Sequence, residues 1–219
     1  MSSSNNSTSN LTPSMSKLPE IFIRHICSIR EASMDTAHNT PMIDSDLKVV
    51  NFDEVKEEYR STLKSNDALF VDSKYRIFFI EFKNGVIIDQ NNVELYEKIY
   101  DSINIFSDIC CEEKVDQICR NAISYLKNNC EYILVYNEEK FNPDLLTGRT
   151  KSGLNRQNCP SGYLHNIKKH VATKAKKEIV LFGLDFFRGY LFCNVHTYTA
   201  EEFRQNMLVK WENAVPKEL

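Results

Sequence analysis

Two short apolar runs on either side of a polar turn form the clearest pattern in the chain. Residues 67–72 hold Ala-Leu-Phe-Val between two aspartates, and residues 76–82 are rich in β-branched and aromatic side chains. Such runs are typical of strands with apolar residues on both faces. Residues 73–75 between them suit a three-residue hairpin loop. The pattern therefore predicts two antiparallel strands joined by a tight turn.

Elsewhere in the chain, apolar residues repeat at intervals of three or four, which is typical of amphipathic helices. Asn51 or Asp53 is a suitable N-cap for the first such helix, and Thr199 with Glu202 forms a capping-box pattern for the last. The elements expected around the hairpin are a short helix or strand at 21–29, a loop at 31–46, a strand at 47–50 (with 86–88 as the alternative third strand of the sheet), helices from about 53 to 64, at 90–109 and at 112–126, a strand at 132–136, a strand pair at 179–184 and 189–198, and a helix at 199–214. This order predicts an α/β fold in which a mixed central sheet is flanked by helices.

The composition of the 219 residues is that of one soluble globular domain. Ser, Thr and Asn dominate residues 1–16, which are expected to form a disordered tail, and residues 17–219 are expected to form a single domain. No apolar run reaches the length of a membrane span, and the N-terminus lacks a signal-peptide pattern. Seven cysteines without a Cys-x-x-Cys pair indicate reduced thiols in a cytoplasmic protein and argue against a zinc site.

The length of the hairpin loop decides which polar side chains meet. If the hairpin is symmetric about Lys74, Asp67 lies directly opposite Glu81. Directly opposed side chains share a face of the sheet, with Cβ atoms about 4.5–5.5 Å apart. Lys83 follows two residues after Glu81 and therefore emerges on the same face. A two-residue loop would instead place Asp67 and Glu81 on opposite faces.

Two facing carboxylates repel each other unless a positive group lies between them. A hard divalent cation fills that role, and Mg²⁺ is typically held by one or two carboxylates together with water and phosphate oxygens. Asp67 and Glu81 are therefore the candidate ligands of Mg²⁺ or Mn²⁺. Lys83 can contact a phosphate oxygen or orient the attacking water. This arrangement predicts metal-assisted hydrolysis of a phosphodiester.

An aspartate that opens one strand, followed by Glu-x-Lys at the end of the next, resembles the PD-(D/E)XK nuclease superfamily. Asn66-Asp67 stands where that superfamily often has Pro-Asp. Glu81-x-Lys83 stands where it has (D/E)-x-K. The similarity covers about residues 50 to 137, and it departs from the superfamily pattern in the missing proline and in the number of clear strands. The resemblance implies a restriction-endonuclease-like core and catalytic roles for Asp67, Glu81 and Lys83.

The resemblance also implies a glutamate on the helix that precedes the aspartate strand. Glu58 borders the apolar stripe that contains Val55 and Tyr59, and it is assigned that role as a second-metal or water-orienting ligand. The alternative is that Glu58 is a solvated helix charge. Lys98, on the long helix that follows the hairpin, is assigned to a solvated face, with contact to a phosphate as the alternative.

Glu-x-Lys alone is a weak signal, because it occurs four times in the chain. Only the occurrence at Glu81 ends an apolar strand-like run with an aspartate one hairpin earlier. The alternative interpretation is that Asp67 caps a turn, and that Glu81 and Lys83 form a surface ion pair at the end of a strand.

A basic segment lies further along the chain. Residues 145–177 contain no Asp or Glu, although the net charge of the chain is −3. The residues of this segment expected to contact nucleic acid are Arg149, Lys151, Arg156, Lys168, Lys169 and Lys174. Such a segment suits the binding of a phosphate backbone. A solvated basic face and a patch for an acidic protein partner are the alternatives.

Together these features predict a divalent-metal-dependent nuclease that hydrolyses phosphodiester bonds of DNA or RNA. The alternative is a catalytically silent module of the same fold that binds nucleic acid or a protein partner. The sequence leaves open a homodimer or an activating protein partner, and also the choice between DNA and RNA.

Overall fold

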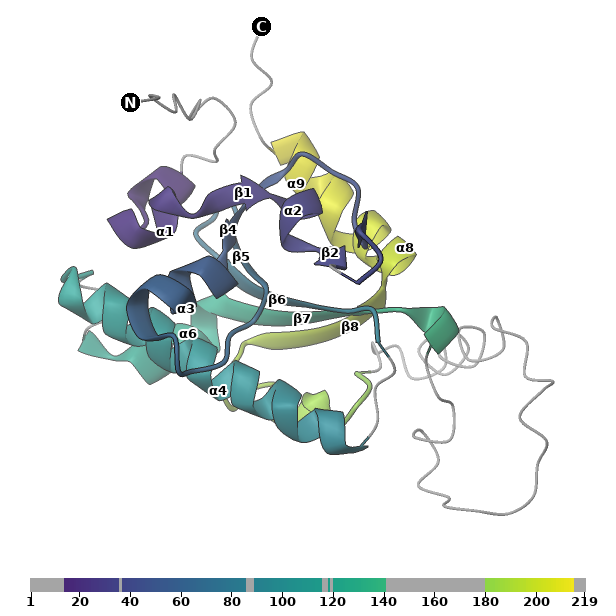
Figure 1. Ribbon diagram of the computed structural model, residues 1–219. Helices are drawn as coiled ribbons and strands as arrows, with labels where there is room; N and C mark the ends of the chain where they lie inside the picture. The colour runs from purple at the N-terminus through teal and green to yellow at the C-terminus, as the bar shows by residue number, and fades with distance from the viewer. Residues whose placement is uncertain are drawn as a thin grey trace, which may run out of the picture.

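A six-stranded mixed sheet forms the centre of the computed structural model (Figure 1). The structure describes residues 14–35, 37–85, 89–115, 118, 120–140 and 180–214. In spatial order the strands are β1 (Ile26–Ser28), β4 (Lys48–Asn51), β5 (Ala68–Val71), β6 (Ile77–Lys83), β7 (Cys130–Tyr136) and β8 (Asn194–Thr199). The first four pair antiparallel, whereas β6, β7 and β8 pair in parallel. The expected α/β fold with a mixed, helix-flanked sheet is therefore confirmed.

Helices cover both faces of this sheet (Figure 1). One face carries α3 (Phe52–Arg60) and α4 (Asp89–Glu112), and the other carries α8 (Ala200–Phe203) and α9 (Val209–Ala214), which are joined by the π-helical turn η5 (Arg204–Leu208). The remaining elements are η1 (Met15–Lys17), α1 (Glu20–Arg24), α2 (Ile29–Ala32), the small hairpin β2 (Met34–Asp35) and β3 (Thr40–Pro41), α6 (Ala122–Asn129), η2 (Glu138–Lys140) and η4 (Leu184–Phe187). None of the helices in the described ranges has the length and apolar character needed to cross a bilayer.

Strand β6 shows why a continuous apolar run is needed at the centre of the sheet. Phe79 faces α4, where its ring meets that of Phe106 edge-on at a centroid distance of 5.5 Å. Phe78 faces α9, with its ring centroid 4.9 Å from that of Trp211. Because side chains alternate along a strand, Glu81 shares the α4 face with Phe79.

The β5–β6 hairpin has the predicted register, since Ala68 pairs with Ile80. Continuing that register by one residue places Asp67 opposite Glu81. The turn itself is held by the Asp72 carboxylate, which accepts the backbone N–H groups of Lys74 and Arg76 at 2.8 and 3.0 Å.

Two predicted N-caps are present in the structure. The Asn51 side chain accepts the backbone N–H of Glu54 at 3.2 Å and starts α3, which ends at Arg60, earlier than the expected residue 64. Thr199 and Glu202 form the predicted reciprocal capping box at the start of α8. Satisfying these otherwise unpaired helix N–H groups is typically worth about 1 kcal/mol per cap.

The single helix expected at 112–126 is wrong. Helix α4 ends at Glu112, and Lys114 then adopts a left-handed backbone conformation with φ of 56°. A new helix, α6, begins at Ala122 with the Asn121 side chain as its cap. The apolar spacing continues through the break, so periodicity alone did not reveal it.

The strand pair expected at 179–184 and 189–198 is confirmed only in part, because β8 covers the end of the second strand and residues 180–184 form no strand. The short helix η4 (Leu184–Phe187) lies between two glycines with positive φ, Gly183 and Gly189, and only β8 joins the sheet in the described part of this region. The strand prediction rested on the aromatic side chains of this segment. In the structure they pack a turn against α4, and the ring centroid of Phe187 lies 5.2 Å from that of Tyr96.

Near the N-terminus the structure differs from the expected elements in two further places. The segment expected as a short helix or strand contains both, α1 followed by β1, and the expected loop contains the β2–β3 hairpin. Met15, inside the segment expected to be a disordered tail, is fully buried. Residues 1–13 and 86–88 lie outside the described part of the chain.

Gly183→Ala is expected to destabilise the fold by about 1–2 kcal/mol, because an L-residue is strained at the φ of 70° found there. An added Cβ would also lie 2.9 Å from the Tyr96 hydroxyl. Gly189→Ala is the matched control, since its φ is 72° but nothing lies within 4 Å of the added Cβ. Urea denaturation of both variants should show the larger loss for Gly183→Ala, and a larger loss for Gly189→Ala would contradict the packing of η4 on α4.

Candidate active site

Asp67 and Glu81 meet at one end of the β5–β6 hairpin. Asp67 directly precedes β5, and its Oδ2 accepts the backbone N–H of Phe82 at 2.6 Å. The Asp67 side chain is therefore fixed against the end of β6, next to Glu81. The Glu81 side chain is only 1% exposed.

Lys98 of α4 links the two carboxylates. Its Nζ lies 2.7 Å from Glu81 Oε1 and 3.3 Å from Asp67 Oδ1. The Lys98 side chain is 18% exposed, so the solvated position assigned to it from the sequence is wrong. Lys98 lies three residues after Leu95 and next to Ile99, both of which are buried. That position on the border of the apolar stripe was the signal that could have placed it.

Burial dominates the electrostatics of the three groups. It raises the pKa of Asp67 to about 6, against the opposing effects of Lys98 and the Phe82 N–H. Burial, and then the Asp67 charge, hold the pKa of Glu81 well above its ordinary value. Burial acts to lower the pKa of Lys98, but the two carboxylates outweigh it and the pKa lies above its ordinary value. One ammonium thus faces two carboxylates. One negative charge is left uncompensated, and a further cation or a proton can neutralise it.

Several buried polar atoms beside these groups lack a hydrogen-bond partner among the described residues. They are Glu81 Oε2 and the Tyr132 hydroxyl, and both side-chain polar atoms of Asn66, the residue before Asp67 in the chain, are also buried without a partner. Glu81 and Asp67 add to the effect of burial in raising the pKa of Tyr132, which places this phenol of β7 in the field of the carboxylates. Buried polar groups are nearly always satisfied, so these atoms are available to a water, an ion or a ligand.

The α3 carboxylate that acts on the site is Asp53. Its charge raises the pKa values of Asp67 and Glu81, and its Oδ1 accepts the Ser65 hydroxyl at 2.5 Å. The sequence offered Asp53 only as a helix cap. Its position in the first turn of α3, at the end of the sheet where Asp67 lies, is the feature that brings it near.

Glu58 points elsewhere. Its two carboxylate oxygens lie 2.5 Å from Arg24 Nη2 and 2.6 Å from His25 Nε2. These partners belong to α1 and the residue that follows it, so the structure joins Glu58 to the N-terminal segment and not to the Asp67–Glu81 pair.

Lys83 lies on the predicted face of β6 but has a different partner. Its Nζ is 3.5 Å from Glu94 Oε2 on α4, and its side chain is 21% exposed. Lys83 therefore extends from the sheet to α4, and Lys98 extends from α4 to the sheet. Both ammonium groups border the layer between β6 and α4.

Among the described residues, no group of three or more His, Cys, Asp or Glu side chains is arranged to hold a metal ion. Asp67 and Glu81 form a pair, with Lys98 as the positive group between them. The six basic residues expected to contact nucleic acid, from Arg149 to Lys174, lie outside the described part of the chain.

Comparison with known proteins gives no relative for this chain. No protein-family model, no curated protein and no solved structure matches it.

Asp67→Asn is expected to flatten the pH dependence of stability between about pH 4 and 6. The pKa of Asp67 rises from 3.8 to about 6 on folding, so in this range the folded state keeps a proton that the unfolded state has lost. The contribution of Asp67 to the free energy of unfolding is therefore largest at low pH and falls by about 3 kcal/mol as the pH rises through the folded pKa. Urea denaturation of both proteins from about pH 4 to 7 measures this slope. Equal slopes would show that Asp67 does not titrate in this way.

Proposed function

We propose that the protein is a divalent-metal-dependent nuclease that hydrolyses phosphodiester bonds, with Asp67 and Glu81 as its metal ligands. One observation carries the proposal: the partly buried Asp67 and the buried Glu81 both contact Lys98 at the end of a hairpin, and Glu81 Oε2 has no hydrogen-bond partner among the described residues. An isolated buried carboxylate oxygen is costly, whereas a bound cation or a coordinated water would satisfy it.

The order of the elements supports the same class of protein. Strands β4, β5 and β6 are antiparallel neighbours in the sheet, the helices α4 and α6 follow, and β7 then pairs in parallel with β6. Three strands, a helix and a further strand are the order implied by the resemblance to the PD-(D/E)XK superfamily, with the aspartate before the second strand and Glu-x-Lys at the end of the third. The helix α3 lies between β4 and β5, whereas the resemblance implies a helix before all three strands.

The donor set fits a hard cation. Asp67 and Glu81 supply two carboxylates, which is the number with which Mg²⁺ is typically bound when water and phosphate oxygens complete the shell. When bound, such an ion polarises the phosphodiester and lowers the pKa of a bound water. Binding at both carboxylates requires the Lys98 ammonium to leave its position between them.

The two lysines have roles that follow from their positions. Lys98, once displaced from the carboxylates, and Lys83, beside Glu94, border the same layer and can offer point charges to phosphate oxygens. Stabilising the negative charge that develops on the phosphorus-bound oxygens is the larger part of catalysis in such reactions.

A second candidate function is a catalytically silent module that binds nucleic acid or a protein partner. The position of Lys98 favours it, since the ammonium already contacts both carboxylates without a metal. In this case the ion triad is a structural feature of the hairpin, and the surface outside it binds the partner.

Incubating the purified chain with mixed DNA and RNA substrates separates the two functions. Cleavage that requires Mg²⁺ or Mn²⁺, stops with a chelator and weakens in Lys83→Ala supports the nuclease. Lys127→Ala, an exposed lysine on α6, is the control and should cleave as the wild type does. Intact substrates in every tube, together with a gel shift that is the same for all three proteins, would favour the silent module.

A further inference from the structure

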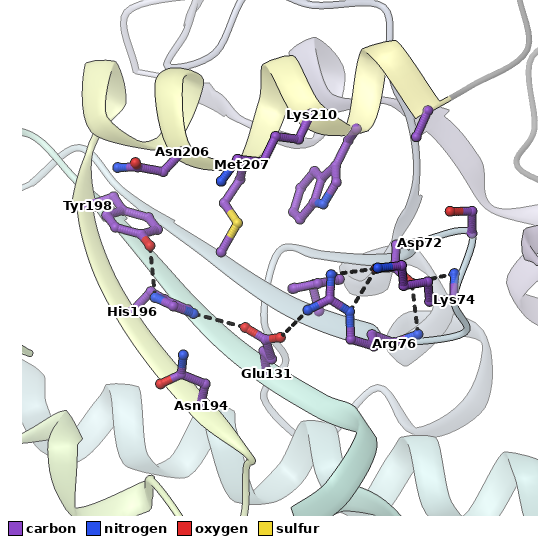
Figure 2. Close-up of a pocket in the computed structure, with 14 residues that line it drawn as sticks. Asp72, Lys74, Arg76, Glu131, Asn194, His196, Tyr198, Asn206, Met207 and Lys210 are labelled. Atoms are coloured by element: carbon purple, nitrogen blue, oxygen red, sulfur yellow. Dashed lines mark hydrogen bonds and ion pairs between the residues drawn. The ribbon is translucent and has the colours of Figure 1, made fainter. Parts of the chain in front are cut away.

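A pocket lies on the face of the sheet opposite Asp67 and Glu81 (Figure 2). It measures about 510 Å³ and opens between the sheet and the helical segment from η5 to α9. Phe78 and Glu131 are paired positions of β6 and β7 that point into it, whereas Glu81 points to the α4 face. Pockets of roughly 300–1,000 Å³ are the usual size for small-molecule sites.

A chain of polar side chains crosses the floor of this pocket (Figure 2). Arg76 donates to Asp72 at 2.8 Å and to Glu131 at 3.1 Å. The other oxygen of Glu131 lies 2.9 Å from His196 Nε2, and the Tyr198 hydroxyl lies 2.8 Å from His196 Nδ1. Because a carboxylate only accepts, Nε2 carries the proton, and Nδ1 then accepts the Tyr198 O–H. The chain fixes these side chains as a rigid floor.

The charges around the pocket leave a positive excess. Arg76 binds both acidic side chains of the lining, Asp72 and Glu131. Lys74 of the hairpin and Lys210 of α9 also line the pocket, and neither has an ion-pair partner among the described residues. Lys74 lies at the hairpin, whereas Lys210 lies beside Met207 (Figure 2). An uncommitted ammonium group in the lining of a pocket favours a ligand with a negative group, such as a phosphate.

The rest of the lining suits a planar ring with hydrogen-bonding edges. Trp211 is held in place by Phe70 and Phe78, at ring-centroid distances of 4.3 and 4.9 Å. Beside it, Met207 offers a polarisable apolar surface, and Asn206 projects its amide near Tyr198, away from Lys74 (Figure 2). An amide can donate to and accept from the edge of a nucleobase.

We propose that this pocket binds a mononucleotide, with the phosphate at Lys74 and the base beside Met207 and Asn206. The site is separated by the sheet from Asp67 and Glu81, so the proposal does not depend on the proposed nuclease activity. Lys74 determines the affinity for the phosphate, and Asn206 determines the preference among bases.

Isothermal titration calorimetry of the full chain in chelator tests this proposal. The ligands are AMP, GMP, CMP and UMP, with the parent nucleosides and inorganic phosphate as separate arms. At least one nucleotide should bind more tightly than about 1 mM, the limit at which binding is worth about 4 kcal/mol. It should bind at least about tenfold more tightly than its nucleoside and than inorganic phosphate. Absence of nucleotide binding, or phosphate binding as tight as that of the nucleotide, would overturn the proposal.

Variants locate the site. Lys74→Ala should weaken nucleotide binding at least tenfold and leave nucleoside binding unchanged. Lys127→Ala and Glu81→Gln should bind the nucleotide as the wild type does. Equal nucleotide binding by Lys74→Ala would place the ligand elsewhere and overturn the proposal. Asn206→Ala should change the order of preference among the four nucleotides, and an unchanged order would overturn the role of Asn206. Circular dichroism confirms that each variant is folded.

Discussion

Lys98→Met is expected to lower the free energy of unfolding at pH 7 by about 3–5 kcal/mol, which is typical for removing one partner from a buried ion pair. The substitution keeps most of the apolar stem of the side chain but leaves Asp67 and Glu81 without the ammonium that lies 3.3 and 2.7 Å from them. Urea denaturation gives the loss directly. The loss should be smaller at pH 5 than at pH 7, because the carboxylates then take up protons, as the pKa of Asp67 at about 6 indicates.

The matched control for Lys98→Met is Lys64→Met. Lys64 pairs with Glu97, which lies on α4 next to Lys98, at 2.6 Å, but the side chains of Lys64 and Glu97 are both about half exposed. Such a surface pair is typically worth about 0–1 kcal/mol. Addition of Mn²⁺ should recover stability in Lys98→Met and not in Lys64→Met, because a cation can then occupy the place of the ammonium. Equal losses in the two variants would contradict the buried triad.

Glu81→Gln is expected to reduce metal-dependent cleavage by at least about 100-fold, while the fold keeps or gains stability. Glutamine preserves the shape of the side chain and removes a charge whose burial is unfavourable, as the raised pKa of Glu81 shows. It also removes a carboxylate ligand from the proposed metal site, where a single stabilising group is worth about 100- to 1,000-fold in rate. Cleavage assays and urea denaturation of the same preparation give the two readouts.

Glu139→Gln is the control for this experiment, since Glu139 is an exposed glutamate in η2, next to the end of β7. It should cleave at the wild-type rate. Cleavage by Glu81→Gln at that same rate would show that Glu81 is not part of the active site. Loss of cleavage together with loss of stability would leave the catalytic role to be decided by the metal titration below.

The sequence was sufficient to predict the hairpin and its register. Loop parity and the alternation of faces are local properties, so the symmetric turn around Lys74 placed Asp67 opposite Glu81 before any tertiary packing was known. The α/β class followed from the same kind of local pattern in the other strands and helices.

The surroundings of the site could not be predicted in the same way. Whether Lys98 faces the sheet or solvent depends on the rotation of α4, which is set by contacts such as that between Phe106 and Phe79. Glu58 was assigned to the site because it borders the apolar stripe of α3, but Arg24 at the end of α1 binds it. These contacts join segments far apart in the sequence, and no local periodicity records them.

The two faces of the sheet carry different chemistry. On the α4 face the polar groups are Asp67, Glu81 and Lys98, with unpartnered buried atoms beside them. On the α9 face, Glu131 and His196 belong to a connected chain that forms the floor of an open pocket. The first arrangement suits a cation and a phosphodiester, and the second suits a small phosphorylated ligand.

Titration of Mn²⁺ into the metal-free chain, followed by calorimetry, tests the metal site most directly, because it needs no knowledge of the substrate. The account predicts one bound ion per chain in the wild type and no detectable binding in Asp67→Asn or Glu81→Gln. Absence of binding by the wild type, or equal binding by all three proteins, would contradict the assignment of Asp67 and Glu81 as metal ligands.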